Sequence, residues 1–263
     1  VTAVADAPVN TVVDTSVTAQ SVNEDATLVF NTTNTNLITI ADVDSTALTT
    51  VVSVTNGTLT ATTGGGATFT SNGSASVTIA GTATQINAAL DGLSYTGTLN
   101  FNGSDTLTVL TTDDTTGTAL TDSDTVAITV TAVNDAPTGA DKTVTTLEDT
   151  DHTFSVSDFG FSDTADTADT LASVKITTLE ATGVLQLNGV DVTLNQVITL
   201  ADITNNLLTF SPIADASGAT YDTFKFAVID NNGGEDASPQ TITIDVTAVA
   251  DAPVNTVVDT SVT

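Results

Sequence analysis

Hydrophobic and polar side chains alternate along most of the chain. Residues 125–131 read TVAITVT and residues 241–247 read TITIDVT, so a branched apolar side chain occupies every second position. Side chains two positions apart lie on the same face of a β-strand, and each segment therefore predicts a strand with one buried face and one face in water. Val, Ile, Leu and Thr dominate, which favours an all-β protein.

The two halves of the chain show the same succession of elements. A strand leads into an acidic turn, Asp113–Gly117 in the first half and Asp230–Gly234 in the second, and the terminal strand follows. Asp, Asn and Gly between alternating segments are typical of a β-hairpin tip. Upstream, Ile86–Leu90 and Ile203–Leu207 predict short helical turns, each followed by a strand with an inward aromatic ring. We therefore expect two similar sandwiches of roughly seven or eight strands each.

The first 18 residues, Val1–Thr18, recur letter for letter as Val246–Thr263. One period is therefore 246 − 1 = 245 residues, and Val130–Pro137 is a degenerate copy of the same junction inside it. This pattern indicates part of a tandem array. The other all-β array, a β-solenoid, would need a much shorter repeat.

The predicted fold is two Greek-key, immunoglobulin-like β-sandwiches joined end to end. Each junction contains Asp-Ala-Pro, and the proline makes the link short and stiff. Residues 1–7 would end the preceding repeat, 8–134 and 135–250 would form the two sandwiches, and 251–263 would begin the next repeat.

The charge is strongly negative: 32 Asp and Glu against three Lys and no Arg give a formal net charge of −29. Nucleic acids and anionic membranes need basic residues to neutralise phosphate, so both are disfavoured as partners. Clustered carboxylates instead favour hard cations with oxygen ligands, above all Ca²⁺. The alternative is that the acids only keep a Thr-rich surface soluble or adapt it to high salt.

Two absences narrow the chemistry. The chain has no cysteine, which excludes disulfides and thiolate zinc sites. The longest uncharged stretch, Ser45–Leu90, is interrupted by Thr, Asn and Gly, so no membrane-inserting segment is expected.

Acidic loops recur at the predicted ends of both sandwiches. In a sandwich of this kind, loops alternate between the two poles, so we expect acids from consecutive domains to meet at each junction. Several carboxylates in a small volume need a cation, which predicts about one to three Ca²⁺ per junction. The predicted ligands of the central junction are Glu24, Asp25, Asn134, Asp135, Asp163, Asp166 and Asp230; the corresponding ligands elsewhere are Asp6, Asp42, Asp44, Asp113, Glu148, Asp149 and Asp251.

Several of these motifs carry a family resemblance. Asn134–Pro137 resembles the Asp-x-Asn-Asp-Asn-Ala-Pro linker of cadherins. The junction, the Glu148–Thr150 turn, the Asp222–Phe226 strand and the Asp230–Asn231 tip more closely resemble the cadherin-like tandem repeats of very large bacterial surface adhesins, many of them RTX-type proteins exported by type I secretion.

The resemblance implies calcium ligands at specific positions. The chain departs from the cadherin pattern in three ways: the linker is one residue shorter, no Asp precedes Asn134 at the expected spacing, and Ala5 and Ala250 replace Asn at the outer junctions. The two junctions with alanine are therefore expected to bind fewer or weaker ions. The matching positions are Glu24 and Glu148 for the first-strand glutamate, Asp42 and Asp44 for the Asp-x-Asp pair, and Asn134 and Asp135 for the linker.

An enzyme is not expected. The single histidine, His152, follows Asp151 at the start of a predicted strand and indicates a surface turn rather than a general base, and no second histidine could complete a metal or proton-relay pair. Paired carboxylates also serve glycosidases, but these lie at predicted domain ends, and the chain has no Trp to line a sugar cleft.

The expected function is that of a structural extender in a long extracellular adhesin of the cell surface. Ca²⁺ at the junctions would stiffen the array, which would project a distal binding region for attachment and biofilm formation. Its partners would be the neighbouring identical repeats of the same chain. Two alternatives are a repeat of a self-assembling filament, sheath or surface layer, with laterally associated copies, and a carbohydrate-binding module.

Overall fold

A computed structural model describes residues 5–13, 19–114 and 119–252. The chain divides into two compact units, Val1–Val133 (unit 1) and Asn134–Thr263 (unit 2), which are described separately. Most of the predicted tip Asp113–Gly117 and most of the predicted start of the next repeat lie outside the described residues.

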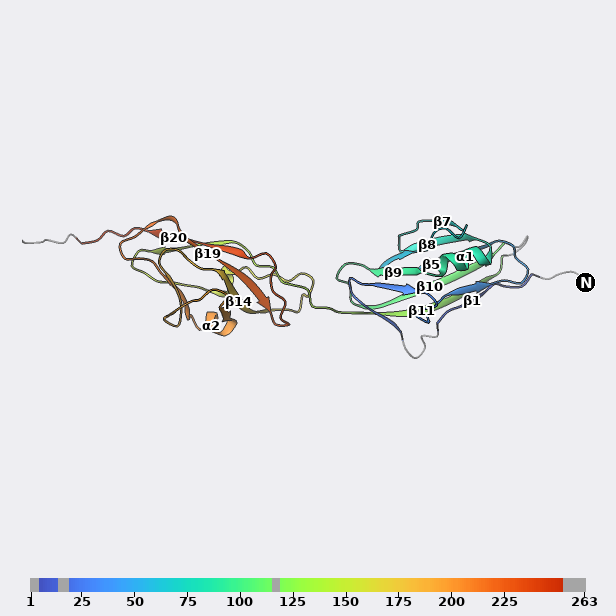
Figure 1. Cartoon of the computed structure of the whole chain (residues 1–263), viewed down its shortest axis with the longest axis horizontal. Coiled ribbons are helices and arrows are strands. Elements are labelled where there is room, and N and C mark those ends of the chain that lie inside the picture. Colours follow the sequence, from blue (N-terminus) through green and yellow to red (C-terminus); the bar gives the residue numbers. More distant parts are fainter. Residues whose placement is uncertain (1–4, 14–18, 115–118, 253–263) are drawn as a thin grey trace, which may run out of the picture. The chain divides into compact units, whose positions relative to one another are not determined.

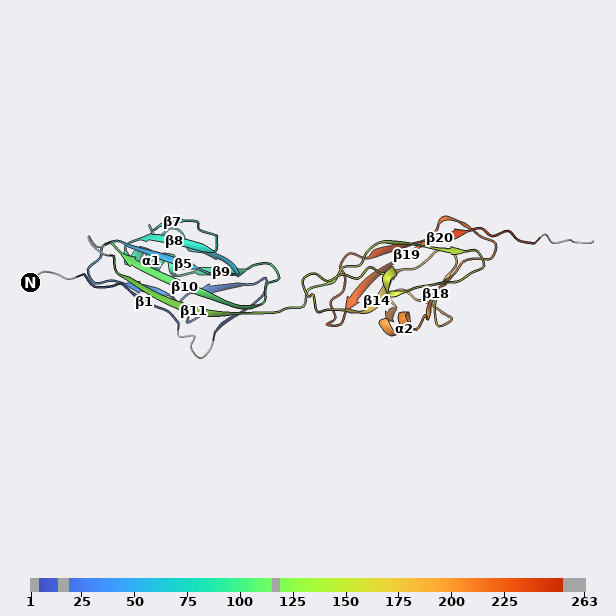
Figure 2. The same ribbon diagram turned by 180° about the vertical axis from the view of Figure 1, so that it is seen from behind.

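Unit 1 is a β-sandwich, visible from both sides in Figures 1 and 2. Its larger sheet has the order β2-β11-β10-β5-β8-β7, its smaller sheet the order β3-β9-β6, and β1 pairs with β4. The elements are β1 (Val9–Thr11), β2 (Gln20–Asn23), β3 (Thr27–Phe30), β4 (Thr39–Ala41), β5 (Leu48–Ser53), β6 (Gly57–Thr60), β7 (Thr68–Thr70), β8 (Ser76–Gly81), α1 (Ala83–Leu90), β9 (Leu93–Gly97), β10 (Gly103–Asp113) and β11 (Thr121–Thr131).

Unit 2 repeats this architecture with a sheet of order β12-β20-β19-β14-β17 and a second of order β13-β18-β15-β16. Its first strand, β12, pairs in parallel with the terminal strand β20, as β2 does with β11 in unit 1. The elements are β12 (Lys142–Leu147), β13 (His152–Thr153), the 3₁₀ turn Val156–Asp158, β14 (Leu171–Thr178), β15 (Val184–Leu187), β16 (Val190–Asp191), β17 (Val197–Thr199), α2 (Leu200–Thr204), β18 (Leu208–Ser211), β19 (Gly218–Asp230) and β20 (Gln240–Thr247).

Each unit has its own hydrophobic core, and the alternating pattern accounts for it. Val126, Ile128 and Val130 of β11 are buried, and the side chains between them point away from the core. Tyr95 of β9 and Phe210 of β18 are fully buried, which confirms the predicted inward rings. The predicted all-β sandwich fold is confirmed.

The two helices begin at threonines whose side chains cap them. Thr82 and Gln85 form a capping box at the start of α1, and Thr199 and Asp202 form one at the start of α2. Both are shorter than a membrane-spanning helix, and in the described part of the chain no helix is long and apolar enough to cross a bilayer.

Candidate metal centres at the two ends of unit 2

Three carboxylates gather where β19 of unit 2 ends. Asp163, Asp169 and Asp230 each place an oxygen within 4.8 Å of the other two. Asp230 is the last residue of β19 and is only 1% exposed, whereas Asp163 and Asp169 come from the loop before β14 and are half-buried. We call these three residues the entry cluster, because Asn134 and Asp135 at the start of the unit lie beside them.

Hydrogen bonds from the hairpin tip fix Asp230. Its Oδ1 accepts from the backbone N–H of Asn232 at 2.7 Å and of Gly234 at 2.9 Å, and its Oδ2 accepts from Asn134 Nδ2 at 3.1 Å. Burial alone would raise the pKa of Asp230, but these donors outweigh it and lower the pKa below its usual value. Asp230 is therefore an anion at neutral pH.

Hydrogen bonds hold the loop carboxylates, and one oxygen of Asp163 is left without a donor. Asp163 Oδ1 accepts from the N–H of Asp166 at 2.9 Å, while its Oδ2 is buried without a hydrogen-bond partner. Asn232 Nδ2 donates to both oxygens of Asp169 at 2.8 Å. Asp166 Oδ2 accepts from the N–H of Asp135 at 2.7 Å, which ties the linker to this loop.

Glycine at position 234 keeps the entry cluster compact. A Cβ on Gly234 would collide with Asp230 Oδ2 and lie 2.7 Å from Asn134 Nδ2. The backbone can therefore close around Asp230 only without a side chain at this position.

The entry cluster suits a hard cation. Ca²⁺ takes oxygen ligands from carboxylates, amides and the backbone. The cluster supplies three carboxylates; hydrogen bonds lower the pKa of Asp230 despite its burial, and one buried oxygen of Asp163 has no donor. No basic residue neutralises it: among the described residues the one ion pair is between Lys175 and Glu235.

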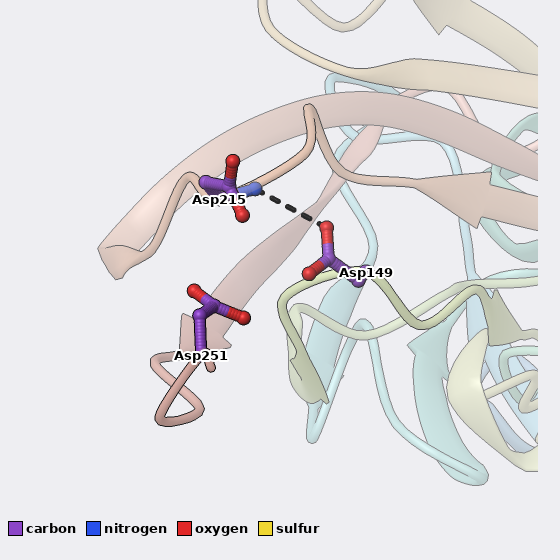
Figure 3. A group of neighbouring side chains, drawn as sticks. All are labelled: Asp149, Asp215 and Asp251. Carbon is purple, nitrogen blue, oxygen red and sulfur yellow. Dashed lines mark hydrogen bonds between the residues drawn. The ribbon is translucent and has the colours of Figure 1, made fainter. Parts of the chain in front are cut away.

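A second group, the exit cluster, comprises Asp149, Asp215 and Asp251 (Figure 3). Asp149 follows β12, Asp215 precedes β19, and Asp251 follows β20; all three are exposed. Asp149 Oδ1 accepts from the N–H of Asp215 at 3.2 Å. Slight desolvation, then the negative charges of Asp215, Glu148 and Asp149, raise the pKa of Asp251.

The two predicted first-strand glutamates anchor the end of each unit. Glu148 Oε1 accepts from the N–H of Val249 at 2.7 Å, and Glu24 Oε1 accepts from the N–H of Val133 at 2.6 Å. Both glutamates are buried. A carboxylate oxygen of each thus holds the chain just before it leaves the unit.

In unit 1, the corner next to Glu24 resembles the exit cluster but has fewer acids. Asp25 Oδ1 accepts from the N–H of Asn100 at 3.1 Å, as Asp149 does from Asp215. In both pairs the accepting aspartate, Asp25 or Asp149, and the donating residue, Asn100 or Asp215, have positive φ angles between 57° and 59°. An amide therefore stands in unit 1 where unit 2 has a carboxylate.

The other end of unit 1 brings Asp6, Asp42 and Asp44 together. Asp44 Oδ2 accepts from the N–H of Asp6 at 3.2 Å, and Asp42 Oδ1 accepts from the N–H groups of Asp44 and Ser45. Burial opposes ionisation of Asp42, but these donors lower its pKa, and its Oδ2 is buried without a partner. The N–H of Asp6 favours the charged form of Asp44, yet desolvation and the carboxylates of Asp42 and Asp6 raise its pKa.

Asp113, the remaining predicted ligand of unit 1, is the last residue of β10, and its Oδ1 accepts from the N–H of Leu120.

The meeting of acids at the central junction stays a prediction. Glu24 and Asp25 belong to unit 1, and Asn134, Asp135, Asp163, Asp166 and Asp230 belong to unit 2. Within unit 2, the structure brings Asp163 and Asp230 together and places Asn134 and Asp135 beside them.

Sequence reasoning did not include Asp169 and Asp215 among the ligand candidates. Asp215 could have been found by comparing the halves: Phe210 lies 115 positions after Tyr95 (210 − 95 = 115), and the same spacing puts Asp215 opposite Asn100. Asp169 is the third aspartate of a loop whose first two were predicted. Its role depends on how that loop folds back, which the sequence does not display.

Unit 2 also contains a cavity next to the entry cluster and a partly buried histidine. A cavity of about 450 Å³ is lined mainly by Val156, Phe161, Leu171 and Leu200, and Asp169 also lines it.

His152 is half-buried at the start of β13, where its ring packs edge-on against Phe154 at 4.7 Å. The prediction that His152 lies in a surface turn is therefore wrong, because the aromatic core extends to this position.

Comparisons with known proteins give a structural likeness only. No protein-family model matches the chain, and no curated protein matches it. It is similar to extracellular cadherin domains 3–6 of protocadherin gamma B2, with a TM-score of 0.44 and 14% identity over 92% of this chain and 50% of that one. It is also similar to the extracellular domain of protocadherin GammaB4, with a TM-score of 0.39 and 13% identity over 91% of this chain and 33% of that one.

A weaker similarity is to an endo-fucoidan hydrolase of glycoside hydrolase family 107, with a TM-score of 0.23 and 18% identity over 75% of this chain and 24% of that one. The chain thus spans half of the first protocadherin structure, a third of the second and about a quarter of the hydrolase.

Proposed function

We propose that this chain is a repeating structural module of a long extracellular adhesin and that Ca²⁺ binds at the ends of its domains. The observation that carries the proposal is the entry cluster, where three carboxylates come together. Asp230 is only 1% exposed, and Asp163 has a buried oxygen without a donor. Leaving such an oxygen unpaired is costly, and a cation removes that cost.

The placement of the two clusters in unit 2 supports a role at domain junctions. Asp230 is the last residue of β19, and Asp215 lies just before its first residue, so the clusters occupy opposite ends of one strand. The entry cluster lies beside Asn134 and Asp135, where the chain enters the unit, and the exit cluster includes Asp251, where it leaves.

The exact sequence repeat extends this argument to successive modules. Asp251 occupies the same position in the recurring 18-residue segment as Asp6, whose N–H donates to Asp44. In an array, Asp251 would therefore touch the exit cluster of one unit and the Asp42–Asp44 loop of the next. A cation shared there would neutralise carboxylates from both sides and limit the swing of the linker.

Under this proposal the array is a spacer at the cell surface, stiff with Ca²⁺ and flexible without it, that holds an adhesive region away from the cell for attachment and biofilm growth. Repetition suits this purpose because every added repeat extends the reach with the same junction chemistry.

Calcium titration by calorimetry or by Tb³⁺ luminescence tests the proposal. The wild-type chain should bind saturably, and Asp230→Asn should weaken the entry site by at least about tenfold, as losses around metal ligands do. Asp191→Asn, which removes an exposed carboxylate of β16, is the matched control and should bind like the wild type. Absence of saturable binding, or equal effects of the two variants, would refute calcium binding at the entry cluster.

A further inference from the structure

The outward face of the larger sheet of unit 1 has no charged side chain among the described residues. On β10 and β11 the buried Leu107, Val109, Val126 and Ile128 point to the core, so the alternate residues point outward. We call the outward residues of β11, β10, β5, β8 and β7 the neutral face. Its central members are Val51, Thr78, Thr106, Leu110, Ser123 and Thr125.

This neutrality is unusual in a chain with 32 acidic residues. Strand β11 itself contains Asp122 and Asp124, but both alternate with the outward Ser123 and Thr125 and so lie on the core side of the sheet. Asp122 Oδ2 there accepts from the N–H of Asn10 at 2.7 Å. The acids of this strand are thus directed away from the neutral face.

The corresponding face of unit 2 shows that the fold does not require neutrality. Phe224, Phe226, Val174 and Ile176 point to the core there, so Lys225 and Lys175 point outward. Lys175 forms an ion pair with Glu235 at 2.8 Å. The same sheet surface is therefore charged in one unit and uncharged in the other.

We propose that the neutral face is a docking surface for a second copy of this chain, face against face. Two molecules of net charge −29 repel each other in most orientations, and the neutral face lets their surfaces touch without opposing carboxylates. Its composition also fits: Leu110, 36% exposed, lies beside Val51 in the middle of the sheet, and threonines and serines surround them. An apolar centre with a polar rim is the usual anatomy of a protein interface.

The size of the neutral face indicates a weak single contact. Strands of six residues are about 20 Å long, and five strands at about 4.8 Å spacing are about 20–25 Å wide, which gives roughly 500 Å². A standard interface buries about 800 Å² per partner, so one pair of faces lies at the transient end. In an array, each repeat would contribute one neutral face. The contacts of successive repeats would act together and hold two chains side by side.

Sedimentation velocity of the whole chain over a concentration series tests this inference, with calcium and with chelator. Leu110→Asp and Thr125→Asp each place a carboxylate on the neutral face. Thr125 is an exposed threonine, so its variant keeps the test valid if Leu110→Asp disturbs folding. Thr223→Asp, an exposed outward position of β19 in unit 2, is the matched control.

We expect the wild-type chain to dimerise reversibly, and more strongly as salt screens the remaining charge. Each neutral-face variant should lower the association constant by about tenfold or more, and Thr223→Asp should leave it within about twofold. A wild type that stays monomeric at every concentration, or a Thr223→Asp variant as weak as Thr125→Asp, would overturn the inference. A third outcome would also overturn the inference: a monomeric wild type that a polysaccharide matrix retains and a Thr125→Asp variant that it does not retain. The neutral face would then bind a glycan.

Discussion

The carboxylates of this protein differ in how readily they take a proton, because burial, hydrogen-bond donors and neighbouring charges differ from one to the next. Asp230 accepts hydrogen bonds from two backbone N–H groups and Asn134, which lower its pKa. Desolvation, followed by the charges of its acidic neighbours, raises the pKa of Asp251. Protons should therefore compete with a cation at the exit cluster at a higher pH than at the entry cluster.

Gly234→Ala should weaken calcium binding at the entry cluster without changing any ligand. The added Cβ would collide with Asp230 Oδ2, so the hairpin tip must move away from the carboxylate. Loss of a supporting contact of this kind reduces metal affinity by about 10- to 100-fold. Gly218→Ala is the control, because a Cβ there meets nothing within 4 Å. Calorimetric calcium titration of both variants makes the comparison. Equal calcium affinities would contradict the role of Gly234 in shaping the entry cluster.

His152 should make the stability of unit 2 depend on pH. Burial lowers its pKa from 6.5, although the charge of Asp158 acts in the opposite direction. The unfolded chain therefore takes up the proton first, and unit 2 should lose stability as the pH falls from 6.5 toward the folded pKa.

Denaturant unfolding between pH 7 and about 5, above the range where most carboxylates titrate, measures this effect. His152→Gln should flatten the dependence. Unit 1 has no histidine and serves as the internal reference. A wild-type unit 2 transition that does not move with pH in this range would contradict the prediction.

At the scale of elements, each unit fastens a turn to its sheet through one buried aspartate. In unit 1, Asp105 of β10 accepts from the N–H groups of Thr55 and Asn56 and from the hydroxyl of Tyr95. Burial, followed by the charge of Asp105, raises the pKa of Tyr95, so the phenol stays protonated and donates. In unit 2, Asp222 of β19 accepts from the N–H groups at 181 and 182.

Asp222→Asn should destabilise unit 2 by roughly 1–3 kcal/mol, because the amide replaces one acceptor oxygen with a donor and leaves a turn N–H unsatisfied. Asp202→Asn is unsuitable as a control since Asp202 caps α2, whereas Asp191→Asn changes an exposed residue and should have little effect. Chemical denaturation followed by circular dichroism measures both. An Asp222→Asn chain as stable as the control would show that the hydrogen bonds of Asp222 to the turn do not stabilise unit 2.

The sequence predicted the strands well because alternation reports directly which side of a strand is buried. The strands ending each unit and the inward Tyr95 and Phe210 were predicted for this reason. The carboxylate clusters were predicted only in part. Asp215 and Asp149 meet because both adopt positive φ at neighbouring corners, and His152 is drawn toward Phe154 by core packing. Such meetings depend on loop conformation and on contacts between distant segments, which alternation does not encode.

At the scale of the whole molecule, three properties act together: a 245-residue repeat, carboxylate clusters at both ends of unit 2, and a charge of −29. Under the proposed function, the acids at neighbouring ends would repel each other without cations, and the short linkers would act as hinges. With Ca²⁺, the same acids would become ligands, and the array would gain a preferred extension. Stiffness would then follow the calcium concentration outside the cell.

The most direct measurement of this claim is the distribution of distances between spin labels placed on the two units. The chain has no cysteine, so Thr58→Cys and Thr223→Cys, both exposed, can be labelled selectively. We predict one narrow distribution with saturating Ca²⁺, a broad one after chelation, and a broad one in Asp230→Asn even with Ca²⁺. A distribution of the same width with and without calcium would contradict the account.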